Sequence, residues 1–474
     1  MEKIKKIVDS CKDDIVRHTS ELIQIKSVEG EEKPGKPFGE GVDKALSYML
    51  DLAKSFGFET ANADGFAGHA DIGDGDDLVG VLVHLDVVPE GTGWDMPAFG
   101  GEVRGNRIYG RGAVDNKGPA VASLFAMKAL KESALPLKKR IRLIFGTHEE
   151  ATSGWSDLNY YFAKYPRPDT GFSPDAEFPV IYGEKGLLNF SLHRTLTPDD
   201  SPVQIENLKG GNAPNMVPDY CEAELTVDES FRHKFEDNFH SYIKKSGYPL
   251  SLEEREDGKR VLRAKGVSVH ASTPEKGTNA LSFMFDFLSQ CPGLNASAGE
   301  FSKNYREKIG FQVNGESIGC QFKDDISGPL TFNAGVAAGD KEKIDLSVNI
   351  RYPISLEGAK VIEGIKRALE GTGVEVGSVG DVKPLFVPKD DELVQKLMEA
   401  YQVETGDYTS GPITIGGGTY ARALPKGVAF GALFPGKEMR AHEKNEYIEI
   451  EDLISATRIF ASALYALAGD KIEE

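Results

Sequence analysis

The chain has 474 residues, of which 40% are hydrophobic, and its 74 Asp and Glu outnumber its 55 Lys and Arg, giving a net charge of −19. This is a globular composition with material for an ample core. The acidic balance argues against nucleic acid or an anionic membrane as a partner, because phosphate contacts need an excess of Lys and Arg. No apolar run approaches the roughly 18 residues of a membrane span, and the N-terminus lacks the apolar core of a signal peptide, so we expect a soluble, cytoplasmic protein.

The first part of the chain is predicted to alternate between helices and strands. Apolar residues recur at helical spacing from Ile4 to Val16 and from Val42 to Phe56. The run Val81-Leu-Val-His-Leu-Asp-Val-Val-Pro89 is predicted to be a buried strand of a parallel sheet, because it is apolar on both faces. His84 and Asp86, two apart on one strand, would share a face. They need partners there, because an unpaired buried polar group costs roughly 1 to 3 kcal/mol.

A strand, a helix and a second strand are predicted to follow one another as a parallel unit. A glycine-rich loop, Gly110-Arg-Gly-Ala-Val-Asp-Asn-Lys-Gly118, precedes a helix from Pro119 to Lys131 and a strand from Arg140 to Gly146. In such units the carboxyl ends of the strands meet at one edge of the sheet, where ligands gather. His84 is therefore expected to lie near Thr147-His-Glu-Glu150.

The pattern changes between about residues 186 and 384, which we predict to be an inserted α+β domain. Its predicted strands include Leu187 to Leu192, Cys221 to Val227 and Ile344 to Tyr352, and its predicted helices Asn279 to Leu288 and Leu356 to Leu369. Residues 1–185 and 385–474 are expected to form an α/β domain with a mixed, mainly parallel sheet flanked by helices. Its last elements are predicted to be a helix from Asp391 to Tyr401, a buried strand from Val428 to Phe434 and a helix from Ile450 to Ala466.

Two histidines and five carboxylates stand out in separate loops: His84, Asp86, Asp115, Glu149, Glu150, Asp175 and His442. Imidazole and carboxylate groups bind Zn²⁺, Mn²⁺ or Co²⁺, and a set without thiolates favours a catalytic over a structural site. Each residue alone has a simpler explanation, since a buried histidine is often a hydrogen-bonded core residue and a loop aspartate a turn or cap. The adjacent Glu149 and Glu150 are the most unusual, because a glutamate pair after a buried strand is costly to ionise without cations. The four cysteines lack CxxC spacing and are expected to be reduced and buried.

These motifs resemble a known family. His84-Leu-Asp86, the loop Gly110 to Gly118, Thr147 to Glu150, Ser173-Pro-Asp175 and His442 resemble the dinuclear-metal peptidases of the aminoacylase and carnosinase type over nearly the whole chain. The long insertion, with Gly211-Asn-Ala-Pro-Asn-Met-Val217 and Gly416-Gly-Gly-Thr-Tyr-Ala-Arg422, is most similar to the bacterial PepV-type (Xaa-His) dipeptidases.

The resemblance implies two divalent metal ions, with Zn²⁺ expected first and Mn²⁺ or Co²⁺ also compatible with the ligands. Asp115 would bridge the two ions. His84 and Asp175 would complete one site, and Glu150 and His442 the other.

The resemblance also implies catalytic residues. Glu149 matches the general base, which would take a proton from a metal-bridging water, and Asp86 matches the acid that orients His84. His270, in Val267-Ser-Val-His-Ala-Ser-Thr-Pro274, resembles a lid histidine that donates a hydrogen bond to the developing oxyanion. A histidine at a strand end in a Ser/Thr-rich turn is the alternative explanation for His270.

Four residues match substrate-binding positions: Asn215, Arg351, Gly417 and Thr419. Arginine suits a bidentate contact with the carboxylate of a peptide, and the glycine run offers backbone N–H groups. A solvated arginine on a strand edge and a plain glycine turn are the alternatives. The other histidines are predicted to be structural: His18, His69, His148, His193, His233 and His240.

The expected function is a dipeptidase that hydrolyses unblocked dipeptides, a small peptide substrate, through a metal-bridging hydroxide with Glu149 as general base. Deacylation of N-acyl amino acids, of the aminoacylase or desuccinylase type, is the alternative within enzymes. A metal-binding or peptide-binding protein without turnover is disfavoured, because it has no need of Glu149. The insertion is nearly twice as long as the lids through which related enzymes dimerise, so we expect a monomer.

Overall fold

The computed structural model describes residues 1–150 and 154–469. It divides into two compact units. The first contains Met1–Gly183, Leu385–Thr414 and Gly418–Glu474, and the second contains Glu184–Pro384 and Ile415–Gly417. The second unit is thus inserted into the first, and a three-residue segment from the later part of the chain groups with it.

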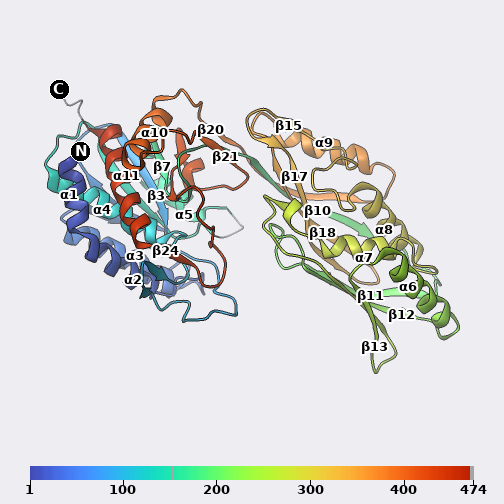
Figure 1. The fold of residues 1–474 in the computed structure, drawn as a ribbon. Helices are drawn as coiled ribbons and strands as arrows, with labels where there is room; N and C mark the ends of the chain where they lie inside the picture. The colour runs from blue at the N-terminus through green and yellow to red at the C-terminus, as the bar shows by residue number, and fades with distance from the viewer. Residues whose placement is uncertain (151–153, 470–474) are drawn as a thin grey trace. The chain divides into compact units, whose positions relative to one another are not determined.

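The first unit is built on a nine-stranded mixed sheet (Figure 1). In spatial order its strands are β1 (Glu59–Asn62), β2 (Ala67–Ile72), β6 (Arg140–Gly146), β3 (Leu78–His84), β7 (Thr170–Ser173), β22 (Gly427–Ala429), β9 (Ile181–Glu184) and β20 (Leu385–Phe386), with β21 (Ile413–Ile415) paired to β9. The strands from β6 to β22 run parallel, and β2 and β9 pair antiparallel on either side of them. All seven residues of β3 are buried, as expected for an apolar strand covered on both faces.

Helices pack around this sheet and confirm the predicted α/β class. They are α1 (Glu2–Ser10), α2 (Lys12–Ile23), α3 (Glu40–Ser55), α4 (Lys117–Ser133), α5 (Ser156–Lys164), α10 (Glu392–Thr405) and α11 (Ile450–Ala468). The helices α4 and α11 pack against each other and against β3, whereas α3 and α5 pack against β2. Within residues 1–150 and 154–469, no helix combines the length and the apolar character that crossing a bilayer requires.

Short strands complete the first unit. The strands β4 (Glu102–Arg104), β5 (Arg107–Tyr109) and β24 (Tyr447–Glu449) form a three-stranded sheet, and β8 (Ala176–Glu177) pairs with β23 (Ala432–Leu433). The small sheet joins a segment near residue 105 to one near residue 448.

Three predicted elements differ from the structure. The predicted helix from Ile4 to Val16 is two helices that meet at Cys11. The predicted strand from Val428 to Phe434 is two short strands, because Gly431 has a φ of 79°, a conformation that interrupts an extended chain. The predicted strand from Val81 to Pro89 is wrong beyond His84, where β3 ends. His84 pairs with Gly146, the last residue of the neighbouring strand β6, so β6 offers no strand partner beyond this point.

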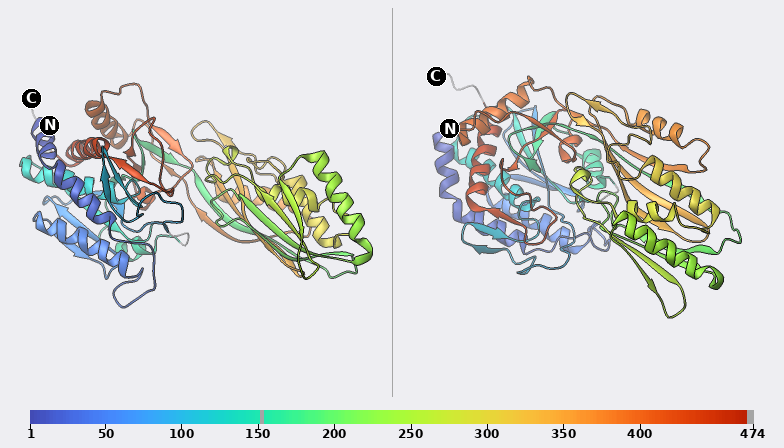
Figure 2. Two further views of the ribbon diagram at one scale, coloured as in Figure 1. Left: turned by 60° about the horizontal axis from the view of Figure 1, so that its bottom comes forward. Right: turned by 45° about the vertical axis from the view of Figure 1, so that its right-hand side comes forward.

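The second unit is built on an eight-stranded antiparallel sheet. In spatial order its strands are β13 (Leu250–Glu254), β14 (Arg260–Lys265), β12 (Tyr220–Val227), β11 (Val203–Gly210), β17 (Thr331–Gly339), β18 (Lys343–Tyr352), β10 (Gly186–Thr195) and β19 (Glu375–Val382). Its main helices are α6 (Arg232–Ser246), α7 (Ala280–Leu288), α8 (Ala296–Lys308) and α9 (Gly358–Leu369), which Figure 2 shows along one face of the sheet. The core between helices and sheet contains Phe235, Phe285, Phe287 and Tyr305.

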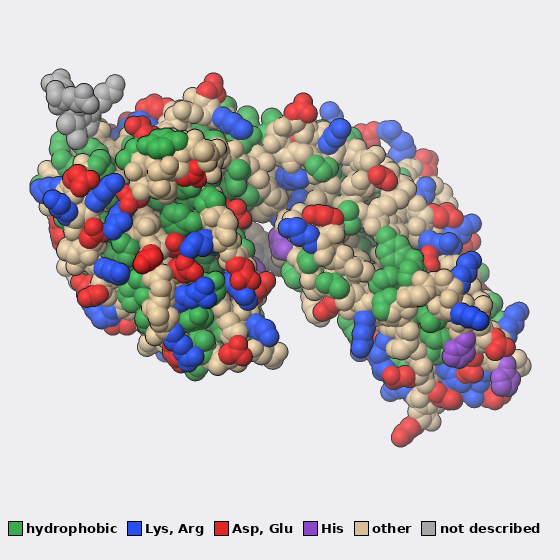
Figure 3. Space-filling view, in the orientation of Figure 1, with side chains coloured by type: hydrophobic (Ala, Val, Ile, Leu, Met, Phe, Trp, Pro, Cys, Tyr) green, Lys and Arg blue, Asp and Glu red, His purple; other side chains and the backbone are tan. Residues whose placement is uncertain are grey.

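The charged side chains on the surface and the state of the cysteines agree with the expectations from the composition. On the face shown in Figure 3, acidic and basic side chains are interspersed over both units. Cys11, Cys221, Cys291 and Cys320 are all free and buried, which confirms the prediction for them.

Candidate metal centre

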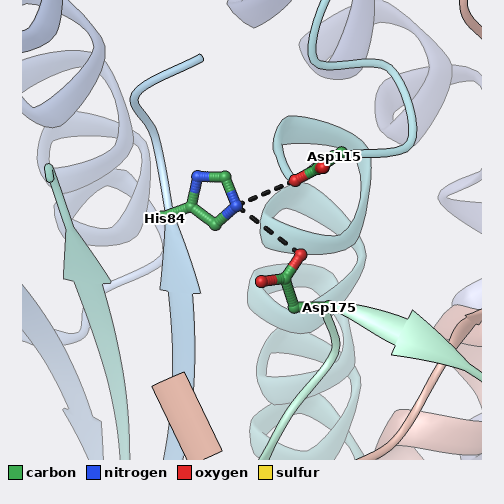
Figure 4. Close-up of side chains that lie close together, drawn as sticks. All are labelled: His84, Asp115 and Asp175. Atoms are coloured by element: carbon green, nitrogen blue, oxygen red, sulfur yellow. Dashed lines mark hydrogen bonds and ion pairs between the residues drawn. The ribbon is translucent and has the colours of Figure 1, made fainter. Parts of the chain in front are cut away.

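Three potential ligands converge at the carboxyl edge of the parallel strands (Figure 4). His84 ends β3, Asp175 follows β7, and Asp115 lies in the loop before α4. The His84 Nε2 atom is 2.9 Å from Asp115 Oδ1 and 3.5 Å from Asp175 Oδ1. Because β3 and β7 are adjacent and parallel, their carboxyl ends place His84 and Asp175 side by side.

A second group shares one residue with the first. The His442 Nε2 atom is 3.0 Å from Glu150 Oε1 and 3.2 Å from Asp115 Oδ2. The two oxygens of Asp115 therefore face different histidines, one toward His84 and the other toward His442. The ligand atoms of each group lie within 4.8 Å of one another, so each group has the compactness of a metal site. The structure brings together all five residues that the sequence predicted as metal ligands.

The charges in this cluster are crowded. Burial, reinforced by Asp175, raises the pKa of Glu149 well above its usual value, and burial raises the pKa of Asp175 to about 7. Burial disfavours a charged imidazole, yet the surrounding carboxylates outweigh it and raise the pKa of His84 well above 6.5 and that of His442 to about 11. These shifted pKa values mean that the carboxylates of the cluster cannot all be ionised together unless positive charge lies beside them.

This donor set fits divalent metal ions. Carboxylate and imidazole groups are ligands for Zn²⁺, Mn²⁺ and Co²⁺, and two cations would neutralise the carboxylates that burial leaves uncompensated. A carboxylate whose two oxygens face two ligand groups, as in Asp115, has the geometry required to join two ions.

Asp86 contacts both the histidine and the glutamate pair. The His84 Nδ1 atom is 3.0 Å from the backbone oxygen of Asp86 and 3.5 Å from its carboxylate. The carboxylate accepts hydrogen bonds from the backbone N–H groups of Glu149, at 3.1 Å, and Glu150, at 3.0 Å. The expectation that His84 and Asp86 share a strand face is wrong, because β3 ends at His84. Their contact forms in the irregular segment that follows the strand.

The side chain of Glu149 is separate from the ligand groups. In the part of the chain that the structure describes, neither compact group of ligand atoms includes Glu149. The charges of Asp175, His84, Glu150 and Asp115 nevertheless affect its pKa, so its carboxylate lies within electrostatic reach of residues of both groups.

Sequence patterns did not reveal two residues that hold the cluster in place. Asn116 donates hydrogen bonds to the Pro174 carbonyl, at 2.7 Å, and to Asp175 Oδ1, at 3.1 Å. The Tyr420 hydroxyl donates to Asp157, whose Oδ2 atom also accepts from the backbone N–H of Thr147 at 2.8 Å. Both residues lie within motifs of the family resemblance, Gly110 to Gly118 and Gly416 to Arg422, but the residue types alone do not indicate which partners their side chains contact.

Arg351 lies inside the sheet of the second unit. Its strand β18 is flanked on both sides, by β17 and β10, and the residue is only 5% exposed, which excludes a solvated strand-edge arginine. Its guanidinium donates to Asn349 Oδ1, at 2.9 Å, and to the Gly416 carbonyl, at 2.8 Å. Arg351 and the glycine run therefore belong to one local cluster.

His270 and Asn215 lie in a neighbouring part of the same unit. The His270 Nδ1 atom is 2.7 Å from the Ser272 hydroxyl, and the backbone N–H of Ala271 donates to the Asn215 carbonyl at 2.8 Å. A Cβ atom built on Gly416 would lie 3.0 Å from Ser272 Cβ, so the glycine run passes close to this turn. Gly417 belongs to the second unit, whereas Thr419 belongs to the first and caps the short helix Tyr420–Ala423.

Four other histidines have structural partners. His18 is 2.6 Å from the Tyr48 hydroxyl, His69 is 2.8 Å from the Tyr161 hydroxyl, and His193 is 2.6 Å from Asp345. His148, next to Glu149, stacks on Phe38 with ring centroids 4.1 Å apart.

Comparison with known proteins yields a family match. The model of "Peptidase family M20/M25/M40" matches residues 80–466. The chain is 41% identical to "Putative dipeptidase YtjP" of Bacillus subtilis (strain 168) over 465 residues, which cover 96% of this chain and 98% of that protein. It is also 41% identical to a "Putative dipeptidase" of Staphylococcus epidermidis over 456 residues, which cover 94% and 95% of the two chains.

Solved structures share the fold. Human carnosine dipeptidase 1 matches with a TM-score of 0.58 and 16% identity, covering 98% of each chain. The di-peptidase Dug1p of Saccharomyces cerevisiae matches with a TM-score of 0.55 and 14% identity, also covering 98% of each chain.

Proposed function

The chain belongs to peptidase family M20/M25/M40, and on that premise we propose that it is a metal-dependent dipeptidase that cleaves unblocked dipeptides. The observation that carries the proposal is that Asp115 belongs to two compact ligand groups, with the carboxylate of Glu149 outside both groups but affected by charges of each. The names of the two bacterial relatives support dipeptides as the substrate class.

We assign the ligands of two divalent ions. His84, Asp115 and Asp175 would hold one ion, and Asp115, Glu150 and His442 the other. When bound, two such ions lower the pKa of a water molecule and polarise a carbonyl oxygen. We propose Zn²⁺ as the first choice. Mn²⁺ and Co²⁺ are also compatible with the ligands, since all three ions bind imidazole and carboxylate.

Glu149 is proposed as the general base. It would accept the proton of the attacking water and pass it to the leaving amine of the cleaved peptide. The buried Asp86 carboxylate accepts a hydrogen bond from the backbone N–H of Glu149. This contact fixes the position of the backbone from which the Glu149 side chain extends. Asp86 also holds His84 through its backbone carbonyl, and we propose that it acts only by positioning these two residues.

We further propose which residues bind the substrate. Arg351 and Asn215, with the backbone N–H groups of Gly417 and Thr419, would bind the free carboxylate of the dipeptide. His270 would donate a hydrogen bond to the developing oxyanion. A carboxylate anchor at one end of the substrate would limit its length, so longer peptides should be poor substrates.

A substrate panel tests the proposed function. Purified protein, loaded separately with Zn²⁺, Mn²⁺ or Co²⁺, would be assayed on dipeptides, on the same dipeptides N-acetylated, and on tripeptides. Rapid cleavage of the free dipeptides alone supports the proposal. Preference for N-acylated substrates would instead identify a deacylase, and metal binding without any turnover would identify a binding protein.

Arg351→Lys tests the carboxylate contact. Lysine keeps the positive charge but loses the planar fork, so KM for dipeptides is expected to rise about 10- to 100-fold, as for a lost hydrogen bond to a charged group. The rise should disappear with dipeptide amides, which have no carboxylate and should bind wild type and variant equally poorly. An equal rise for acids and amides would show that Arg351 supports only the fold.

We also propose that the protein acts as a monomer. Light scattering of the purified chain at micromolar concentration is expected to give the mass of one chain, 51.6 kDa. An obligate dimer would contradict the proposal.

A further inference from the structure

A buried glutamate close to the metal centre has no role in the proposed chemistry. Glu446 lies four residues after His442, and its side chain is completely buried. Its carboxylate accepts hydrogen bonds from the backbone N–H groups of Gly112, Val114 and Asp115, at 3.1, 3.0 and 3.3 Å. Its backbone oxygen accepts from the N–H of Gly110 at 2.9 Å. One residue thus fixes the main chain of the loop that carries Asp115.

Arg111 reinforces the same connection. Its guanidinium is buried and lies 2.7 Å from the Glu446 carboxylate, and it also donates to the Glu443 carbonyl at 3.2 Å. Removing one partner of a buried ion pair leaves the other charge uncompensated, which is strongly destabilising. The loop of Asp115 and the segment 442–446 are therefore held together by both side chains.

The segment that carries His442 needs such support. His442 has a φ of 65° and Asn445 a φ of 58°, in the left-handed region that non-glycine residues rarely adopt. Each such residue costs roughly 1 to 3 kcal/mol and persists only where surrounding contacts enforce it. Asn445 exchanges two hydrogen bonds with Asp95, at 2.9 and 2.7 Å, but the His442 side chain itself is 48% exposed. The position of His442 therefore depends on its anchored neighbours more than on packing of its own ring.

The other ligand group is anchored differently. His84 ends a fully buried strand, and Asp175 follows the adjacent strand and accepts a hydrogen bond from Asn116. In this group only Asp115 lies on the loop that Glu446 holds, whereas in the other group Glu446 holds both that loop and the segment of His442.

We propose that Glu446, together with Arg111, is a positioning residue that ties His442 to the backbone of Asp115 and thereby sets the affinity of one of the two ions. This ion is the one assigned to Asp115, Glu150 and His442. The inference rests on the two-ion assignment in the proposed function.

The test is metal binding to Glu446→Gln. Metal-free wild type and variant would be titrated with Mn²⁺ by calorimetry, and the spin coupling between two bound Mn²⁺ ions followed by electron paramagnetic resonance. In the variant the first ion is expected to bind nearly as in wild type. The second should bind about 10- to 100-fold more weakly, the usual effect of removing a residue that supports a ligand. At two equivalents of Mn²⁺ the coupled signal should give way to that of an isolated ion.

A matched control separates this effect from lost stability. Asp71 and Arg142 form another buried, bidentate ion pair, at 2.8 and 2.7 Å, within the sheet. Asp71→Asn should lower the melting temperature without a selective loss of one ion. If Glu446→Gln does not fold, Arg111→Lys replaces it, because lysine preserves the charge beside Glu446 but loses the fork, and it should weaken the same ion.

The outcomes distinguish the two proposals. A wild-type protein that binds fewer than two ions contradicts the proposed function. A wild-type protein that binds two, with variants that lose both ions equally or neither, contradicts the positioning role of Glu446.

Discussion

Glu149→Gln is expected to bind both metal ions as wild type does and to reduce kcat by about 100- to 10,000-fold, the range for loss of a general base. Glutamine keeps the shape of the side chain but cannot accept the proton. The backbone N–H of residue 149 still donates to Asp86, so the loop should keep its place. Metal content by mass spectrometry and steady-state kinetics on a dipeptide would measure the two effects separately.

A second glutamate near the same loop provides the control. Glu29 is exposed and lies 3.4 Å from His148, the neighbour of Glu149. Glu29→Gln should leave kcat within about twofold, as expected of a surface substitution away from special features. If Glu149→Gln retained more than a few per cent of wild-type turnover, another group would have to be the base.

Asp115→Asn is expected to abolish activity by a different route, through loss of both ions. Its two oxygens face the two histidines of the two groups, and an amide offers only one oxygen and no charge. Supporting residues alone change metal affinity about 10- to 100-fold, so losing this shared ligand should cost more than about 100-fold for each ion. Calorimetric titration with Mn²⁺ measures both affinities.

Asp175→Asn is the comparison that makes the Asp115 result specific. Asp175 belongs only to the group with His84, so its amide variant should weaken one ion and leave the other close to wild type. If Asp115→Asn also weakened only one ion, the shared position of this carboxylate would be without consequence and the two-ion assignment would need revision.

Sequence patterns predicted the residues of the site better than the contacts that hold them. The order of strand, helix and strand was sufficient to place His84 near the segment Thr147 to Glu150, because parallel strands end at one edge. Asp115 and His442 were candidates by residue type, but their pairing was expected from the family resemblance alone, since nothing in the spacing of residues 115 and 442 links them. Their contact depends on the small sheet in which β24 pairs with β5.

The end of the strand β3 and the supporting residue Glu446 could not be predicted from the sequence, for physical reasons. An apolar run shows that a strand is buried but not where its partner stops, and β3 stops where β6 does. Glu446 appears in the sequence as an ordinary charged residue before the strand β24. Its burial becomes visible only when the loop of Gly112 to Asp115 is folded against it.

The insertion also orders events during synthesis of the chain. His84, Asp115 and Asp175 leave the ribosome early, whereas His442 emerges only after the whole segment Glu184–Pro384 has been made. Domains generally fold as units, and β22 and α11, which pack within the first unit, also follow the inserted segment in the chain, so neither ligand group is assembled before that segment has been made. On the proposed mechanism, a chain interrupted before residue 442 lacks a metal ligand and the helix α11, and it is expected to have no peptidase activity.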